Sequence, residues 1–144
     1  MKKVLLALFT LVALSAQAQY ADLKGLTFQA TTYYLTDEGA SKAKVCNEIF
    51  DISFSDGFMV HNILTDDGKI DQAQFYKISD LRRSSEDGIS MFKFQAISGI
   101  TGNSYKYWVK INADGIATIS LISSDADITY KGGTYNLKTY DQNP

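Results

Sequence analysis

Apolar and polar residues alternate over much of the chain after residue 25, and turn sequences interrupt them about every ten residues. Alternation with a period of two is typical of strands with one buried face. Beyond the first eighteen residues, no long stretch keeps the helical period of about 3.6, and Ser79–Arg83 is the one short helix candidate. The pattern predicts an all-β fold of eight to nine strands, over residues 26–36, 45–54, 58–64, 70–78, 89–97, 104–112, 116–123, 127–131 and 134–140.

The sequence Ser55–Gly57 predicts a three-residue hairpin loop, because its glycine can adopt a positive φ. In this register Phe54 lies opposite Phe58, and His61 lies opposite Asp51 on the more polar face. An exposed pair of this kind contributes about 0–1 kcal/mol to stability. Replacing His61 with Ala is therefore expected to change the fold very little.

A second hairpin is predicted at Gly132–Gly133, since a type I′ turn needs a positive φ at both central positions. This turn would pair Tyr130 with Tyr135 on one face and Asp127 with Lys138 on the other. Aromatic and opposite-charge pairs each stabilise a hairpin by up to about 1 kcal/mol. The chain would then contain two separate strands here.

A third turn, at Asn112–Gly115, joins two strands that carry apolar residues on both faces. A strand pair of this kind is usually covered on both sides, so we expect a second sheet, a partner or a ligand against one face. One face carries Tyr105, Tyr107, Val109, Ile111, Ile116 and Ile122, and the other carries Trp108, Ala117, Ile119 and Leu121 beside Lys106 and Lys110.

The first eighteen residues have the three parts of a secretory signal peptide. Lys2 and Lys3 form a basic start, Val4–Leu14 is apolar, and Ser15–Ala18 ends in a small-x-small pattern. The apolar run is too short to span a bilayer comfortably. We therefore expect cleavage that leaves Gln19 as the first residue, and a soluble exported protein without a membrane span.

Removal of residues 1–18 from the 144 leaves 126, which is the size of a single domain. We expect residues 19–144 to form one all-β domain in the periplasm or the secreted fraction. Without Lys2 and Lys3 the chain has 12 basic and 16 acidic residues, a net charge of −4 with histidine neutral. This balance disfavours nucleic-acid binding, which needs a positive surface.

The sequence contains no recognisable catalytic or metal-binding constellation. Cys46 is the only cysteine, so an internal disulfide is excluded; a buried thiol is expected, with an intermolecular bridge as the alternative. His61 is the only histidine, and no Gly-x-Ser-x-Gly sequence supplies a nucleophile. One histidine and one cysteine fall short of the three or four ligands of zinc, and Asp66–Asp71 lacks calcium-loop spacing. We expect a protein that is not an enzyme, with no metal and no cofactor.

Aromatic and arginine side chains are the candidates for ligand contact, although the aromatic residues are also good strand formers. Tyrosine packs apolar surface while its hydroxyl remains available to a partner, and such residues line pockets and interfaces. The two arginines lie together in the longest predicted loop, Ser79–Gly88, and arginine suits bidentate contacts with carboxylates. The candidate ligand-binding residues are Tyr76, Tyr105, Tyr107, Trp108, Arg82 and Arg83.

Two functions fit these features. An up-and-down barrel, the fold that we favour, can bind a small apolar or amphipathic ligand, with Tyr105 and Tyr107 facing the interior. The chain resembles the lipocalin-like barrels in length, export signal and meander order; Leu23–Phe28 has a glycine before an aromatic residue but no Gly-x-Trp, so no family is assigned. The alternative is an extracytoplasmic β-sandwich that contacts a protein or a glycan, with Trp108 on its outer surface. Trp108 is expected to be partly buried.

Overall fold

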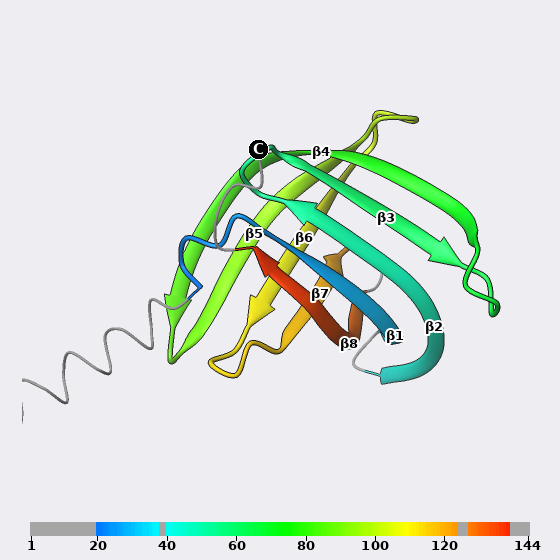
Figure 1. The fold of residues 1–144 in the computed structure, drawn as a ribbon, viewed down its shortest axis with the longest axis horizontal. Coiled ribbons are helices and arrows are strands. Elements are labelled where there is room, and N and C mark those ends of the chain that lie inside the picture. The colour runs from blue at the N-terminus through cyan, green and yellow to red at the C-terminus, as the bar shows by residue number, and fades with distance from the viewer. Residues whose placement is uncertain (1–19, 38–39, 124–126, 139–144) are drawn as a thin grey trace, which may run out of the picture.

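Eight antiparallel strands close into one up-and-down barrel in the computed structural model, which describes residues 20–37, 40–123 and 127–138 (Figure 1). Each strand pairs with the next along the chain, and β8 (red) lies beside β1 (blue) to close the sheet. The predicted all-β barrel is confirmed, and the β-sandwich alternative is wrong. The strands are β1 (Gly25–Asp37), β2 (Ala40–Ser53), β3 (Phe58–Leu64), β4 (Ile70–Glu86), β5 (Ile89–Ser98), β6 (Ser104–Ile111), β7 (Ala117–Ile122) and β8 (Asp127–Lys138).

The barrel interior is filled by side chains from all eight strands, because alternate residues of a strand point to the same face. Leu23, from the segment before β1, is buried at one end of the barrel. The predicted signal peptide lies outside the described residues. Within the described part of the chain, no helix has the length and apolar character needed to cross a membrane. Interior residues include Leu26, Phe28, Phe50, Ile52, Met59, Ile78, Phe92, Phe94, Val109, Ile119 and Tyr130.

The prediction of a loop with a short helix over Ser79–Gly88 is wrong, because β4 continues to Glu86. The pairing of β4 with β5 shifts between Ser79 and Arg82, and Asp80 has a φ of 53°. A β-bulge of this kind inserts an extra residue into one strand, which breaks the period of two that identifies a strand in the sequence. The polar composition of this part of β4 concealed the strand as well.

The β2–β3 hairpin has a four-residue turn, whereas the sequence predicts three residues. Ser53 pairs with Phe58, the Gly57 amide donates to the Ser53 carbonyl over 3.0 Å, and the Asp56 amide donates to Ser53 Oγ over 3.1 Å. The serine side chain thus stabilises a longer turn than the glycine alone indicates. The predicted pairing of Phe54 with Phe58 is wrong by one residue.

This difference of one residue places every side chain of β3 on the opposite face of the sheet from the predicted one. His61 and Met59 face the interior, and the side chain of Phe58 is 45% exposed. The prediction of an exposed His61–Asp51 pair is therefore wrong: His61 lies opposite Phe50 and is only 4% exposed. Because His61 is buried, its replacement is expected to lower stability, contrary to the expectation from the sequence.

The β6–β7 hairpin also differs from the predicted register. Its turn includes Ile116, whose carbonyl accepts a hydrogen bond from the Asn112 amide over 3.0 Å. Ile111 consequently pairs with Ala117, and both face the interior. The prediction that Ala117, Ile119 and Leu121 share a face with Trp108 is wrong, and the barrel interior covers the apolar face of this hairpin.

Gly132 and Gly133 lie inside β8, so the predicted type I′ turn between two strands is wrong. Neither glycine has the positive φ that such a turn needs. The register of β1 shifts between Ala30 and Thr32 against both neighbouring strands, and Gly132 lies against this irregularity. A Cβ at Gly132 would come within 1.9 Å of the Gln29 carbonyl oxygen, so glycine is required for close backbone approach.

Replacing Gly132 with Ala should therefore lower the free energy of unfolding by about 2–3 kcal/mol, because the backbone of β1 must move. Gly133→Ala is the matched control, since a Cβ at Gly133 contacts no described atom within 4 Å; we expect a change of about 0.5 kcal/mol or less. Urea unfolding measures both. Equal losses in the two variants would instead support a turn with a positive φ at both glycines.

Candidate functional site

A cavity of about 250 Å³ lies in the barrel interior, towards the β3–β4 and β5–β6 turns. We call it the mouth cavity. Its wall combines aromatic, polar and aliphatic side chains that point inward from six strands, β2, β3, β4, β6, β7 and β8. It is lined by Tyr76, Tyr105, Tyr107 and Tyr130, by Glu48, His61 and Gln74, and by Ile63 and Leu121.

A buried hydrogen-bonded pair lies at this cavity. His61 Nε2 and Glu48 Oε1 are 2.8 Å apart, and the two residues are 4% and 7% exposed. The imidazole also stacks on the Phe50 ring, with centroids 4.0 Å apart and an interplanar angle of 13°. Burial of a carboxylate is costly and is offset only by close, well-oriented hydrogen bonds, so the pair requires the precise β2–β3 register.

The Glu48 contact determines the chemistry of the imidazole. Because Nε2 faces a carboxylate oxygen, Nε2 carries a proton and donates it in the hydrogen bond. Nδ1 is buried and has no hydrogen-bond partner among the described residues. In the neutral imidazole this nitrogen is an acceptor, and a buried acceptor without a partner costs about 1–3 kcal/mol.

Three tyrosines at the mouth cavity, Tyr76, Tyr107 and Tyr130, have raised pKa values and retain their hydroxyl protons at neutral pH. Burial raises the pKa of Tyr107, and the neighbouring Tyr76 adds to the shift. The pKa of Tyr130 is raised by burial first and then by the Glu48 carboxylate, and burial raises that of Tyr76 as well. The cavity therefore offers neutral hydroxyl groups, and the Tyr76 hydroxyl donates to Gln74 Oε1 over 2.8 Å.

These shifts predict weaker folding in alkaline solution. Above about pH 10, the ordinary pKa of tyrosine, the unfolded chain loses protons that the folded protein retains, so the free energy of unfolding falls as the pH rises. Tyr107→Phe should reduce this pH dependence, whereas Tyr34→Phe on the outer face should leave it unchanged. Urea unfolding at about pH 8 and about pH 10.5 tests the sign; an equal pH dependence in all three proteins would contradict it.

Cys46 lies on β2 two residues before Glu48. It is half-buried, which is less than the sequence predicts. Burial, a hydrogen bond to Glu48 and the Glu48 charge raise the pKa of its thiol to about 12. The protonated thiol is a poor nucleophile, since thiolate is the reactive form. Within residues 20–37, 40–123 and 127–138, no cluster of three or more His, Cys, Asp or Glu residues has a geometry suited to a metal ion.

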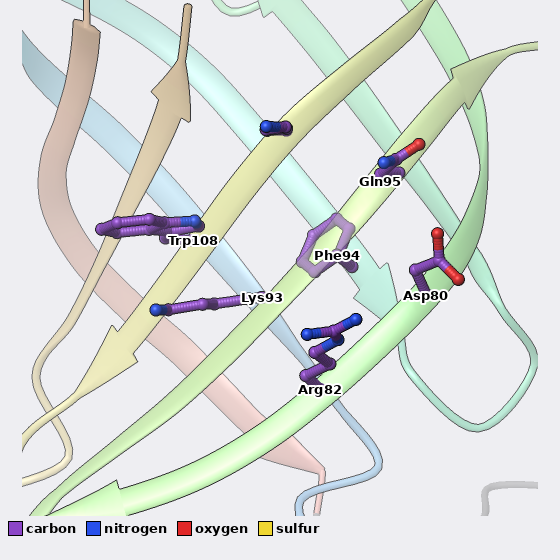
Figure 2. Close-up of a pocket in the computed structure, with 7 residues that line it drawn as sticks. Asp80, Arg82, Lys93, Phe94, Gln95 and Trp108 are labelled. Atoms are coloured by element: carbon purple, nitrogen blue, oxygen red, sulfur yellow. The ribbon is translucent and has the colours of Figure 1, made fainter.

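A second hollow, of about 300 Å³, lies on the outer wall of the barrel (Figure 2). We call it the wall pocket. Trp108 is half-buried here, which confirms its predicted partial burial. Lys93 Nζ lies 4.3 Å and Lys110 Nζ 5.9 Å from the centroid of the Trp108 ring. The pocket is lined by Asp80 and Arg82 on β4, Lys93, Phe94 and Gln95 on β5, and Lys106 and Trp108 on β6.

The six candidate residues fall into three separate places. Tyr76, Tyr105 and Tyr107 meet at the mouth cavity, whereas Arg82 and Trp108 lie at the wall pocket. Adjacent residues of a strand point to opposite faces, so the two arginines separate.

Arg83 belongs to the closed end of the barrel. Its guanidinium lies 5.6 Å from the Phe54 ring centroid and 5.3 Å from that of Phe92. Arg83 Nη1 also donates to the carbonyls of Ala21 and Leu23, over 3.2 Å and 2.7 Å. Its role is to hold the segment before β1 across the barrel end.

Glu48, His61 and Tyr130 lie at one site that the sequence pattern does not predict. A signal for Glu48 is present, because it precedes Phe50 and Ile52 at intervals of two and so shares their inward face. The register error at the β2–β3 turn removed the corresponding signal for His61.

Comparison with known proteins adds no relative. No family model matches the sequence, and neither a curated protein nor a solved structure matches it.

Proposed function

We propose that this protein is an exported, non-catalytic binding protein that takes a small amphipathic ligand into the mouth cavity. The observation that carries the proposal is the buried Glu48–His61 pair beside four tyrosines at an interior cavity. Aromatic walls with a few placed polar groups are typical of small-molecule sites. A stable core alone would not need a buried polar pair of this kind, since apolar residues of similar volume stabilise as well or better.

The size of the cavity limits the ligand. Its volume of about 250 Å³ is below the range of about 300–1,000 Å³ for pockets that take drug-sized molecules. Phe50, Phe94 and other buried side chains fill the barrel beyond it. A single ring with one polar group fits this description, and a long acyl chain does not.

The polar groups favour a neutral or cationic ligand. The Glu48 carboxylate and His61 Nδ1 are acceptors, so they suit a hydroxyl or ammonium group that donates hydrogen bonds. A carboxylate at a partly desolvated site repels a second anion. The tyrosine rings contact the apolar part of such a ligand and add cation–π attraction to an ammonium group.

Three probes of one size test this proposal: benzylamine, benzyl alcohol and benzoate share a ring and differ in charge. His61 is the only histidine and Trp108 the only tryptophan, so the NMR signals of the two rings report on the two pockets separately. We expect saturable shifts of the His61 signals with benzylamine and benzyl alcohol, and much weaker ones with benzoate. Absence of binding by all three probes would contradict the proposal.

The variant Tyr107→Phe tests whether the Tyr107 hydroxyl contacts the ligand, because it keeps the ring and removes the hydroxyl. Loss of one hydrogen bond worth about 1 kcal/mol weakens binding about fivefold. Tyr34→Phe, on the outer face near Lys131, is the control and should bind as the unaltered protein does. Equal affinities of all three proteins would exclude the Tyr107 hydroxyl from ligand contact.

The export part of the proposal rests on the signal-like segment before Gln19. Mass spectrometry of protein recovered from outside the cytoplasm should give a chain that begins at Gln19. A soluble product that retains Met1 would contradict this part and leave the ligand site to be tested on its own.

A further inference from the structure

The wall pocket collects cationic side chains in a protein whose net charge is −2. Arg82, Lys93 and Lys106 line it. Among the described residues, none of the three has a carboxylate within ion-pair distance, whereas Lys69 has Asp67. Unpaired cations gathered on one face give a locally positive potential despite the acidic chain.

The β4 bulge shapes this pocket. It places Asp80 and Leu81 opposite the single residue Phe94, between the paired positions Ser79–Gln95 and Arg82–Lys93. The extra residue interrupts the sheet where Phe94 lines the hollow. Asp80 has a φ of 53°, an uncommon conformation for a residue other than glycine, and both bulges and strained residues occur often at binding sites.

Trp108 provides a large aromatic surface at the same place. Arg82 pairs with Lys93, Lys93 with Trp108, and Trp108 with Ser120, so these side chains form a row on the outer face of neighbouring strands. Successive strands are about 4.8 Å apart, a spacing that lets one ligand contact several members of the row. Figure 2 shows Arg82 and Trp108 on either side of Lys93 and Phe94.

We propose that the wall pocket binds an acidic carbohydrate, a sugar that carries a carboxylate. The Arg82 guanidinium suits a bidentate contact with this carboxylate, and the Lys93 ammonium, whose Nζ lies over the Trp108 ring 4.3 Å from its centroid, is a second cation beside the indole. Asp80 and Gln95 offer polar atoms to sugar hydroxyls, and the Asp80 charge disfavours a compact dianion such as phosphate.

The composition of the pocket argues against a protein partner. The centre of a protein interface is usually apolar and depleted of charged residues. None of the large apolar side chains that are exposed in the described part of the chain lines the wall pocket. A ligand that combines hydroxyl groups with a carboxylate therefore matches the lining better than a peptide surface does.

Trp108 fluorescence, from the only tryptophan, tests the proposal with three probes. A galacturonate oligomer carries the proposed chemistry, a dextran oligomer is its uncharged counterpart, and polyglutamate is a peptide polyanion. We expect the galacturonate oligomer alone to change the fluorescence saturably, with affinity falling as salt rises, and His61 NMR signals to stay in place. Equal binding of dextran, or polyglutamate binding as tight as galacturonate, would overturn the proposal.

Single charge removals locate the site. Arg82→Gln and Lys106→Gln should each weaken galacturonate binding about tenfold, as the loss of a charge-assisted contact does. Lys77→Gln is the control, because Lys77 is also exposed on β4 but does not line the pocket; it should change the affinity less than about twofold. An equal loss in all three variants would show attraction to overall charge and overturn the assigned site, whatever the mouth cavity binds.

Discussion

Replacing His61 with Phe should lower the free energy of unfolding by about 3–5 kcal/mol, because Glu48 is left buried without its partner. In the unaltered protein the Phe50 ring stacks on the His61 imidazole, with centroids 4.0 Å apart. A phenylalanine at position 61 keeps an aromatic contact with Phe50. The loss therefore reports on the unpaired carboxylate more than on packing. Urea unfolding at neutral pH measures it.

The double variant Glu48→Leu/His61→Phe is the control. Replacement of a whole buried pair by apolar residues is often neutral or stabilising, so most of the lost stability should return. The double variant should also fail to bind benzylamine while remaining folded, which separates the role of the pair in binding from its role in stability. A cost below about 1 kcal/mol for His61→Phe would show that the pair is solvated.

Phe50→Ala should cost about 3–5 kcal/mol, the usual effect of truncating a large buried aromatic residue. Phe50 is fully buried, and its ring centroid lies 4.8 Å from that of Tyr130 and 6.4 Å from that of Phe28. The truncation opens space directly behind His61. Thermal or urea unfolding measures the loss.

Phe58→Ala is the matched control for Phe50→Ala. Phe58 begins the neighbouring strand β3, faces outward and is 45% exposed, so we expect a loss of about 1 kcal/mol or less. The register predicted from the sequence places both phenylalanines on one buried face. Equal and large losses in the two variants would support that register and contradict the observed one.

The period of two along the chain was sufficient to predict an all-β fold, because each strand shows one apolar face to the interior; it favoured a barrel over a sandwich without deciding between them. Turn length was not predictable from glycine positions alone. At the β2–β3 hairpin the Ser53 side chain adds a hydrogen bond that lengthens the turn, and this one residue decides whether His61 is buried. Bulges at Thr31 and Asp80 break the period of two, and no residue type in the sequence marks their positions.

The sequence predicted only those residues of the candidate site whose position does not depend on the register between strands. Tyr105 and Tyr107 face the interior as the barrel hypothesis requires, since their own alternation is regular. Glu48 and His61 come together only in the observed register, and Tyr130 joins them only because β8 crosses Gly132 without turning. Contacts between strands depend on register, which a single sequence specifies less well than it specifies the strands.

Intermolecular NMR contacts test the central claim, that the mouth cavity binds a ligand, most directly. With benzylamine or benzyl alcohol bound, nuclear Overhauser effects should join the probe's ring protons to the ring protons of His61 and Tyr107, which line the cavity. The Trp108 ring, on the outer wall, should show none. Effects confined to Trp108, or none at either place while the protein remains folded, would contradict the account.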